Sequence, residues 1–277
     1  NTMSFHENIA RQACEVLGQS GDHAVDLNNT MRLLAKWRSI LIANTLIKAE
    51  GICVQQGPLS GMEFLAQSAE GCHVAKLLGC YEQPLQPFVE EAIVKNYDVV
   101  LNIGCAEGYY AVGMARRMPQ TKFVAYDTDI NAQRACIDLA RKNGVESQIE
   151  VNGTFNPAVL EQFKGQAVLV FCDVEGAELE LLCPDSAPVL RDFDLIVESH
   201  ECLISGVTEK LTSRFSESHE VILVPDHGAR NLDHPPDWFQ ELAHLDQLLA
   251  VWEWRSGPTP WLVMNANKSV PNSKAAE

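Results

Sequence analysis

The stretch VVLNIGCAEGYY at residues 99–110 decides the fold class of this chain. Four of its first five residues are aliphatic, as in a buried strand, and Gly104 and Gly108 flank a turn where backbone can approach a ligand closely. About 20 residues later, the apolar segment at 122–126 ends on Asp127, where α/β nucleotide-binding units place an acid for both ribose hydroxyls. The pattern predicts a cofactor that contains adenosine.

The spacing of the glycines distinguishes between two classes of cofactor. A dinucleotide fingerprint requires G-x-G-x-x-G, but Ala106 and Tyr109 stand at the second and third glycine positions. S-adenosylmethionine has no phosphate and tolerates a looser turn. We therefore expect S-adenosylmethionine rather than NAD, with a chance glycine turn between strand and helix as the alternative.

A second stretch, AVLVFCDVEGAELELL at residues 167–182, is another apolar strand that ends on acids. Together, LNIGCAEGYY, AYDTD and CDVEGAELELL resemble the FkbM-like family of class I S-adenosylmethionine-dependent methyltransferases, which carries an Asp-x-Glu-Gly-x-Glu signature after its fourth strand. The resemblance covers residues 77–224. It implies a seven-stranded sheet with one reversed strand and methyl transfer to oxygen. Asn102 departs from the pattern, because many class I enzymes carry an acid at the end of the first strand.

Strand and helix patterns alternate from residue 97 onward. Strands are expected at 99–103, 123–126, 149–151, 168–171, 195–198, 220–224 and 260–264, and helices at 110–117, 131–142 and 157–163. Residues 226–237, rich in His, Pro and Asp, are expected to form a long loop. Such alternation with buried strands predicts an α/β fold, a Rossmann-like and mostly parallel sheet covered on both faces.

We expect three regions along the chain. Residues 1–70 form a helical extension with helices at 5–17 and 30–49, which serves as a lid over the substrate, as a dimer surface, or simply as a cap on the domain. Residues 71–265 form the S-adenosylmethionine-binding domain. Residues 266–277 are polar and are expected to be a disordered tail.

Composition restricts the possible partners and the compartment. The net charge of −16 and the lack of a Lys/Arg cluster argue against nucleic acid, which requires a basic surface. The longest apolar run, at 39–47, is too short to cross a bilayer, and the N-terminus lacks a signal-peptide pattern, so no membrane partner is expected. Nine cysteines without C-x-x-C pairing favour reduced thiols and a cytoplasmic location.

In an open α/β sheet the ligand binds outside the carboxyl ends of the strands, beside the first one. The expected cofactor contacts are Asn102, Gly104, Cys105, Ala106, Glu107, Gly108, Asp127, Thr128, Gly153, Thr154 and Asp173. Asp127 should bind the ribose, and Gly153 and Thr154 should border the adenine. The alternative role for Asp127 is the N-cap of the helix that starts near Asn131.

Transfer of a methyl group to a hydroxyl requires a positioned acceptor and a base. Asp173, Glu175, Glu198 and His200 are the candidate catalytic residues, although a structural role for His200 is equally compatible with the sequence. Asp173, Glu198, His200, Glu201 and His227 could also bind a divalent cation, which the spacing leaves open. We assign Glu178 and Glu180 to the following helix, where a negative charge near the first turn suits the helix dipole.

These observations predict an S-adenosylmethionine-dependent methyltransferase that acts on the oxygen of a small hydroxylated metabolite or sugar. The O-selectivity follows from the family resemblance alone. A non-catalytic protein that binds S-adenosylmethionine or a nucleotide is the alternative. An NAD-binding protein is a weaker one, because the glycine spacing is imperfect. The expected partner is a small-molecule acceptor, and a homodimer is possible.

Overall fold

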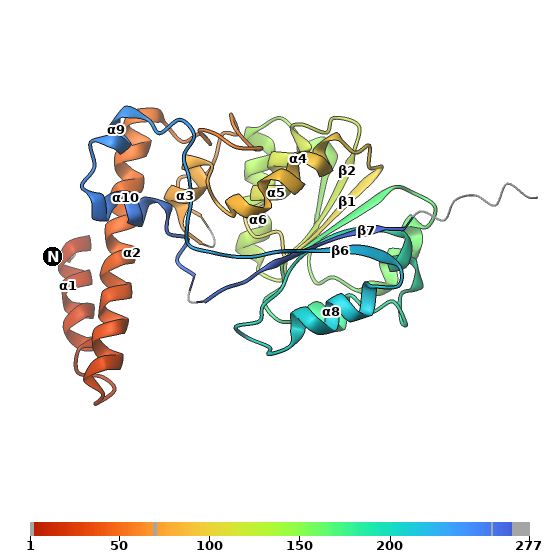
Figure 1. Cartoon of the computed structure of the whole chain (residues 1–277). Coiled ribbons are helices and arrows are strands. Elements are labelled where there is room, and N and C mark those ends of the chain that lie inside the picture. Colours follow the sequence, from red (N-terminus) through yellow and green to blue (C-terminus); the bar gives the residue numbers. More distant parts are fainter. Residues whose placement is uncertain (1–2, 69–70, 256, 268–277) are drawn as a thin grey trace, which may run out of the picture.

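The computed structural model describes residues 3–68, 71–255 and 257–267, in which seven strands form one sheet in the order β3-β2-β1-β4-β5-β7-β6 (Figure 1). The strands are β1 (Val99–Ile103), β2 (Lys122–Tyr126), β3 (Ile149–Asn152), β4 (Val168–Cys172), β5 (Asp194–Glu198), β6 (His219–Val224) and β7 (Trp261–Ala266). Only β7 is reversed, since it pairs antiparallel with both β5 and β6 while the other neighbours pair parallel. The predicted Rossmann-like sheet with one reversed strand is confirmed.

The central strands explain where the ligand site forms. Every residue of β1 and β4 is buried, as expected for parallel strands covered on both faces. Ile103, the last residue of β1, pairs with Tyr126 of β2 and with Cys172 of β4. The three strands therefore end at the same level, and the residues that follow them meet at one edge of the sheet.

Helices cover both faces of this sheet (Figure 1). One face packs against α3 (His73–Leu78), α4 (Gln86–Val94), α5 (Tyr109–Ala115) and α6 (Ile130–Lys142), and the other against α8 (Val207–Phe215) and the 3-10 helices at Pro157–Phe163 and Pro188–Asp192. Within β1, Val100 belongs to the first core and Leu101 to the second, because successive side chains of a strand point to opposite faces. A further short helix, α7 (Glu178–Leu181), follows β4.

The N-terminal helices form a hairpin that projects from the side of the sheet domain (Figure 1). α1 spans Phe5–Val16, and α2 spans His23–Glu50, which starts seven residues before the expected helix because Asp22 caps it. The Asp22 carboxylate accepts hydrogen bonds from the N–H groups of Ala24 and Val25. Residues after Gly51 belong to the domain body rather than to the extension, since Met62 and Phe64 are fully buried in its core.

The segment between β6 and β7 differs from expectation at its end. Residues 226–236 contain no helix or strand, as predicted, but α9 (Asp237–Gln240) and α10 (His244–Val251) follow, and α10 packs on α2. Arg38 of α2 forms a two-bond ion pair with Asp246 of α10, at 2.8 and 2.6 Å. α2, near the start of the chain, and α10, near its end, therefore form one structural unit.

The boundary predicted between the domain and the tail, at residue 266, is wrong. Ala266 belongs to β7, and the N–H of Asn267 donates to the carbonyl of Ser218 at 2.9 Å, because pairing with β6 continues to this point. The rest of the expected tail, 268–277, lies outside the described residues. Within the described part of the chain, no helix has the length and hydropathy needed to cross a bilayer.

Candidate active site

A cleft of about 400 Å³ lies at the carboxyl ends of β1, β2 and β4. Six of the expected cofactor contacts line it, namely Gly104, Asp127, Thr128, Gly153, Thr154 and Asp173, together with Tyr126, Phe155 and Glu175. The ends of three neighbouring strands thus bring together residues that are up to about 70 positions apart, as the rule for open α/β sheets requires. We call this hollow the cofactor cleft.

Nearby protein atoms leave no room for a side chain at the two glycines of the first turn. Gly104 has φ +77°, and a Cβ there would lie 1.5 Å from the carbonyl oxygen of Asp173. At Gly108, with φ +90°, a Cβ would lie 2.7 Å from the sulfur of Cys136. A larger residue at either position would therefore push β4 or α6 away from the cleft.

Asp127 is held rigidly at the end of β2. Its Oδ2 accepts a hydrogen bond from the N–H of Ala106, and its Oδ1 accepts one from the N–H of Asp129, both at 2.8 Å. Each carboxylate oxygen retains a second lone pair, so both could still accept from a ribose hydroxyl. The N-cap of α6 is Asp129, whose carboxylate accepts from the N–H of Asn131, so the capping alternative for Asp127 is wrong.

The remaining expected cofactor contacts do not line the cleft. The residues that line it do not include Asn102, Cys105, Ala106, Glu107 and Gly108. The side chain of Glu107 is fully buried and forms an ion pair with Lys76 at 2.6 Å, with the Lys76 ammonium 5.0 Å from the centre of the Tyr81 ring. Glu107 therefore has a structural partner that its place in the glycine turn did not indicate.

A second cavity of about 350 Å³ adjoins the cofactor cleft, and we call it the rim cavity. All four candidate catalytic residues line it: Asp173, Glu175, Glu198 and His200. Asp173 and Glu175 line both hollows, so the two share a boundary. The same cavity is also lined by Lys36 of α2 and by Tyr81, Glu253, Trp254, Arg255 and Thr259.

His200 is oriented by a residue that the sequence analysis assigned only to a helix. Its Nδ1 donates to Oε1 of Glu178 at 2.5 Å, while its Nε2 lies 3.5 Å from Asp173 and 3.4 Å from Glu198. Burial lowers the pKa of His200, but the hydrogen bond to Glu178 and the charges of the nearby carboxylates outweigh it and raise the pKa above its usual value. A histidine held in this way can take up a proton at Nε2 or bind a metal ion there.

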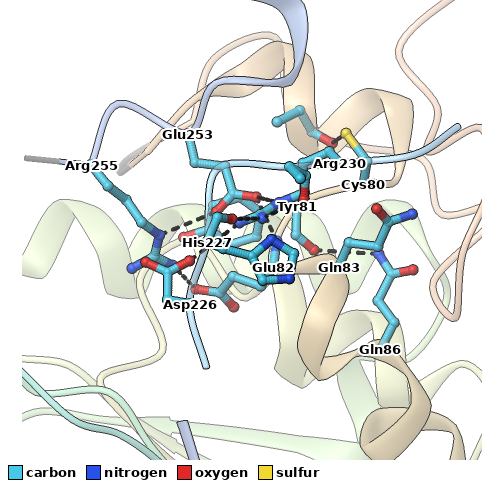
Figure 2. Close-up of polar contacts among 12 residues, drawn as sticks. Cys80, Tyr81, Glu82, Gln83, Gln86, Asp226, His227, Arg230, Glu253 and Arg255 are labelled. Atoms are coloured by element: carbon cyan, nitrogen blue, oxygen red, sulfur yellow. Dashed lines mark hydrogen bonds and ion pairs between the residues drawn. The ribbon is translucent and has the colours of Figure 1, made fainter. Parts of the chain in front are cut away.

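Arg255 links Glu198 to a buried network of charges. Its guanidinium forms ion pairs with Glu82, Glu198 and Glu253, and Arg230 pairs with the other oxygen of Glu253 at 2.6 Å. Figure 2 shows the ion pairs that join Arg255, Glu253 and Arg230. Sequence reasoning missed this network, and no local signal could have found it, because Arg255 and Glu82 are 173 positions apart.

The network sets the protonation of two buried acids. Burial raises the pKa of Glu198, but the charge of Arg255, hydrogen bonding with Asp173 and the charge of His200 lower it below its usual range. Burial and the charges of Glu198 and Glu253 raise the pKa of Glu82 to about 7, against the opposing charge of Arg255. Glu198 is therefore the carboxylate of the pair that stays ionised near neutral pH.

Among the residues that the structure describes, one group could hold a metal ion at this site. Asp173, Glu198 and His200 each offer one ligand atom, and these atoms lie within 4.8 Å of one another. Glu178 is hydrogen-bonded to Nδ1 of His200, which leaves Nε2 for the metal. Carboxylates commonly bind the second ring nitrogen of metal-bound histidines in this way. Glu201 does not belong to the group, because its carboxylate accepts from the N–H groups of Gly206 and Thr208 at the start of α8, and His227 also lies outside it.

Comparisons with known proteins agree with this architecture. The model of a family described as O-methyltransferase matches residues 88–178. A curated relative, the ribosomal protein L11 methyltransferase of Caldanaerobacter subterraneus subsp. tengcongensis, is 26% identical over 132 residues, which cover 48% of this chain. The matched region spans only 40% of that relative's length.

Two solved structures illustrate the structural likeness. Cofactor-bound Rv0187 from MTB has a TM-score of 0.45 and 13% identity, covering 93% of this chain and 97% of that one. The O-methyltransferase TomG from Streptomyces achromogenes, involved in tomaymycin synthesis and solved with SAM, has a TM-score of 0.43 and 12% identity, covering 82% and 89%. Both TM-scores are below 0.5.

The strand order, the single reversed strand and the cleft beyond β1, β2 and β4 define the architecture of class I S-adenosylmethionine-dependent methyltransferases. The match to the O-methyltransferase family model falls on β1, β2 and β4, the strands that carry the cleft. The chain therefore has the fold of this class, and its match to the O-methyltransferase family model covers residues 88–178.

Proposed function

We propose that this protein transfers the methyl group of S-adenosylmethionine to a hydroxyl of a small metabolite or sugar, as a member of the FkbM-like branch. One observation carries the proposal: Asp173 and Glu175 line both the cofactor cleft and the rim cavity. A methyl donor in the first hollow and an acceptor in the second would therefore meet at these two carboxylates.

The residues of the chain suit the parts of this reaction. S-adenosylmethionine, when bound, supplies an electrophilic methyl group and leaves as S-adenosylhomocysteine. Asp127 would hold the ribose, while Gly153 and Thr154 would border the adenine. The acceptor oxygen would attack in line with the breaking carbon–sulfur bond, so positioning within the rim cavity contributes most of the rate enhancement.

The proton of the acceptor hydroxyl needs a base at the same place. His200 is suited to this role, because Glu178 holds its Nδ1–H and leaves Nε2 directed toward Asp173 and Glu198. Asp173 is the other candidate, since it is the more exposed of the two groups, at 28% against 8% for the His200 side chain. In either case the proton stays within this cluster of carboxylates and imidazole.

The alternative is a protein that binds S-adenosylmethionine or a nucleotide without catalysis. The oriented pair of His200 and Glu178 favours the enzyme, because a binding protein has no need of a base beside the cofactor cleft. NAD is the weaker cofactor candidate, since the first turn lacks the second and third glycines of the dinucleotide fingerprint. We also propose a cytoplasmic setting, which the nine free cysteines favour.

Calorimetry and a turnover assay test this function. The purified chain should bind S-adenosylhomocysteine more tightly than NAD, and hydroxylated compounds should stimulate release of S-adenosylhomocysteine from S-adenosylmethionine. Mass spectrometry of small molecules that copurify with the protein would narrow the choice of acceptors. Tight binding of NAD would contradict the cofactor, and methylation of amines but not of hydroxyls would contradict O-transfer.

A further inference from the structure

The N-terminal hairpin and α10 expose an unusual amount of apolar surface. On α2, Leu27 and Met31 are each 61% exposed and Leu34 is 41% exposed, and on α10 Leu245 and Leu248 are each 66% exposed. Leu27, Met31 and Leu34 follow one another at helical spacings of four and three residues. They form one stripe along α2, the pattern of a helix that packs against another helix.

In the described part of the chain, the hairpin of α1 and α2 has little packing against other helices on its outer side. No residue of α1 is buried, although α1 is amphipathic, and in the described part of the chain α1 packs chiefly on α2, away from the sheet (Figure 1). Helices gain most of their stability in proteins from packing an apolar face against a further element. Within the described part of the chain, the stripe of Leu27, Met31 and Leu34 on α2 stays exposed, as a face that packs against a further element would be before that element binds.

A groove of about 830 Å³ marks where that partner would lie. It runs between α2 and α10, and its walls are mostly apolar, with Leu34, Trp37, Leu249 and Trp252 among them. At one end the groove reaches Arg255, which also lines the rim cavity. An occupant of the groove would thus lie beside the candidate active site.

The distribution of charge favours a second copy of the chain as the occupant. Residues 1–50 contain five Lys/Arg and five Asp/Glu and are neutral, whereas the whole chain has 21 Lys/Arg and 37 Asp/Glu. The entire net charge of −16 therefore belongs to residues 51–277, with 16 basic and 32 acidic residues. Two copies that meet through residues 1–50 therefore avoid the net repulsion that contact between their acidic bodies would cause.

We propose that a second copy of this chain covers the groove, with the stripe of Leu27, Met31 and Leu34 packed against the same stripe of its partner. A two-fold axis makes one patch self-complementary, as in most homodimers. The paired hairpins would form a four-helix arrangement that excludes water from both grooves. This dimer would also close the end of the groove beside Arg255, and it does not depend on the reaction proposed above.

Sedimentation equilibrium on the full chain at micromolar concentration tests the dimer. We expect twice the chain mass of 30.6 kDa for the wild type. The double variant Leu27→Glu/Met31→Glu should be monomeric, because two-fold pairing would bury four carboxylates together. Leu223→Glu is the matched control, since Leu223 is 54% exposed on β6 in the body of the protein, and it should remain dimeric.

If the double variant fails to fold, amide hydrogen exchange of the wild type at different protein concentrations tests the dimer instead. Dilution should speed amide exchange in residues 24–38 and in α10, and leave exchange in β1 and β4 unchanged. A wild type that stays monomeric at all concentrations would overturn the proposal. That result would also be obtained if an apolar ligand or another protein, rather than a second copy, fills the groove. A dimer that survives Leu27→Glu/Met31→Glu, or concentration-dependent protection confined to β3 or β6, would overturn it too.

Discussion

The imidazole of His200 and the carboxylate of Glu178 form a buried pair, with Nδ1 of the ring 2.5 Å from Oε1 of the acid. His200 is 6% exposed and Glu178 is fully buried. The N–H of Gly176 donates to the same carboxylate oxygen at 3.0 Å, which fixes it relative to the loop that follows β4. The pair connects the loop after β4 to the end of β5, and it directs the second ring nitrogen of His200 into the rim cavity.

Replacement of His200 should separate turnover from cofactor binding. His200→Gln should lower turnover about 100- to 10,000-fold, the usual range for loss of a general base, with little change in affinity for S-adenosylhomocysteine. His219→Gln is the control, because His219 is equally buried but contacts the carbonyl of Phe193 at 2.8 Å and lines neither hollow. Near-wild-type turnover in His200→Gln, measured with an identified acceptor, would exclude the base.

Removal of divalent ions distinguishes a metal site from a metal-free base. If Asp173, Glu198 and His200 hold a metal, calorimetry should detect Mn²⁺ binding to the wild type, and Asp173→Asn should lose about tenfold or more of that affinity. A chelator should then abolish turnover, and added Mn²⁺ should restore it. Turnover that resists the chelator would rule out the metal and leave the base in place.

Asp127 should determine cofactor affinity, and its neighbour Asp129 should not. Asp127→Ala should lose about 1.5–3 kcal/mol of binding free energy for S-adenosylhomocysteine, the size of a hydrogen bond to a charged group. Asp129→Ala removes the N-cap of α6 instead, and should cost about 1 kcal/mol of folding stability with affinity retained. Calorimetry measures both affinities, and equal losses in the two variants would argue against a ribose contact at Asp127.

His73 should make the fold sensitive to acid. Burial and the charge of Lys76 lower the pKa of His73 from 6.5 to about 4, and its Nε2 has no hydrogen-bond partner within the described structure. Between these values the unfolded chain binds the proton and the folded chain does not, so stability falls as the pH drops through this window.

Urea unfolding at about pH 7 and about pH 5 measures this effect. The wild type should lose about 2 kcal/mol from this group. His73→Phe, which keeps a ring against Phe64, should lose correspondingly less between the same two pH values. An equal loss in the wild type and the variant would show that folding does not lower the pKa of His73.

The sequence by itself determined the sheet and the position of the cofactor cleft. The apolar runs that became β1, β2 and β4 lie within short windows, and the residues directly after them, such as Gly104, Asp127 and Asp173, must lie at the carboxyl ends of those strands. Parallel pairing with aligned ends then brings these residues together. Local periodicity and one rule of α/β topology were sufficient here.

Only the tertiary structure decided the partners of the polar side chains. Glu178 reads locally as an acid in the first turn of a helix, yet it orients His200 from 22 positions away. Arg255 lies in the segment between α10 and β7. Its role depends on its ion pairs with Glu82 and Glu198, which are 173 and 57 positions away. The physical reason is that strand and helix patterns depend on neighbouring residues, whereas ion pairs in the interior depend on which distant loops the completed fold brings into contact.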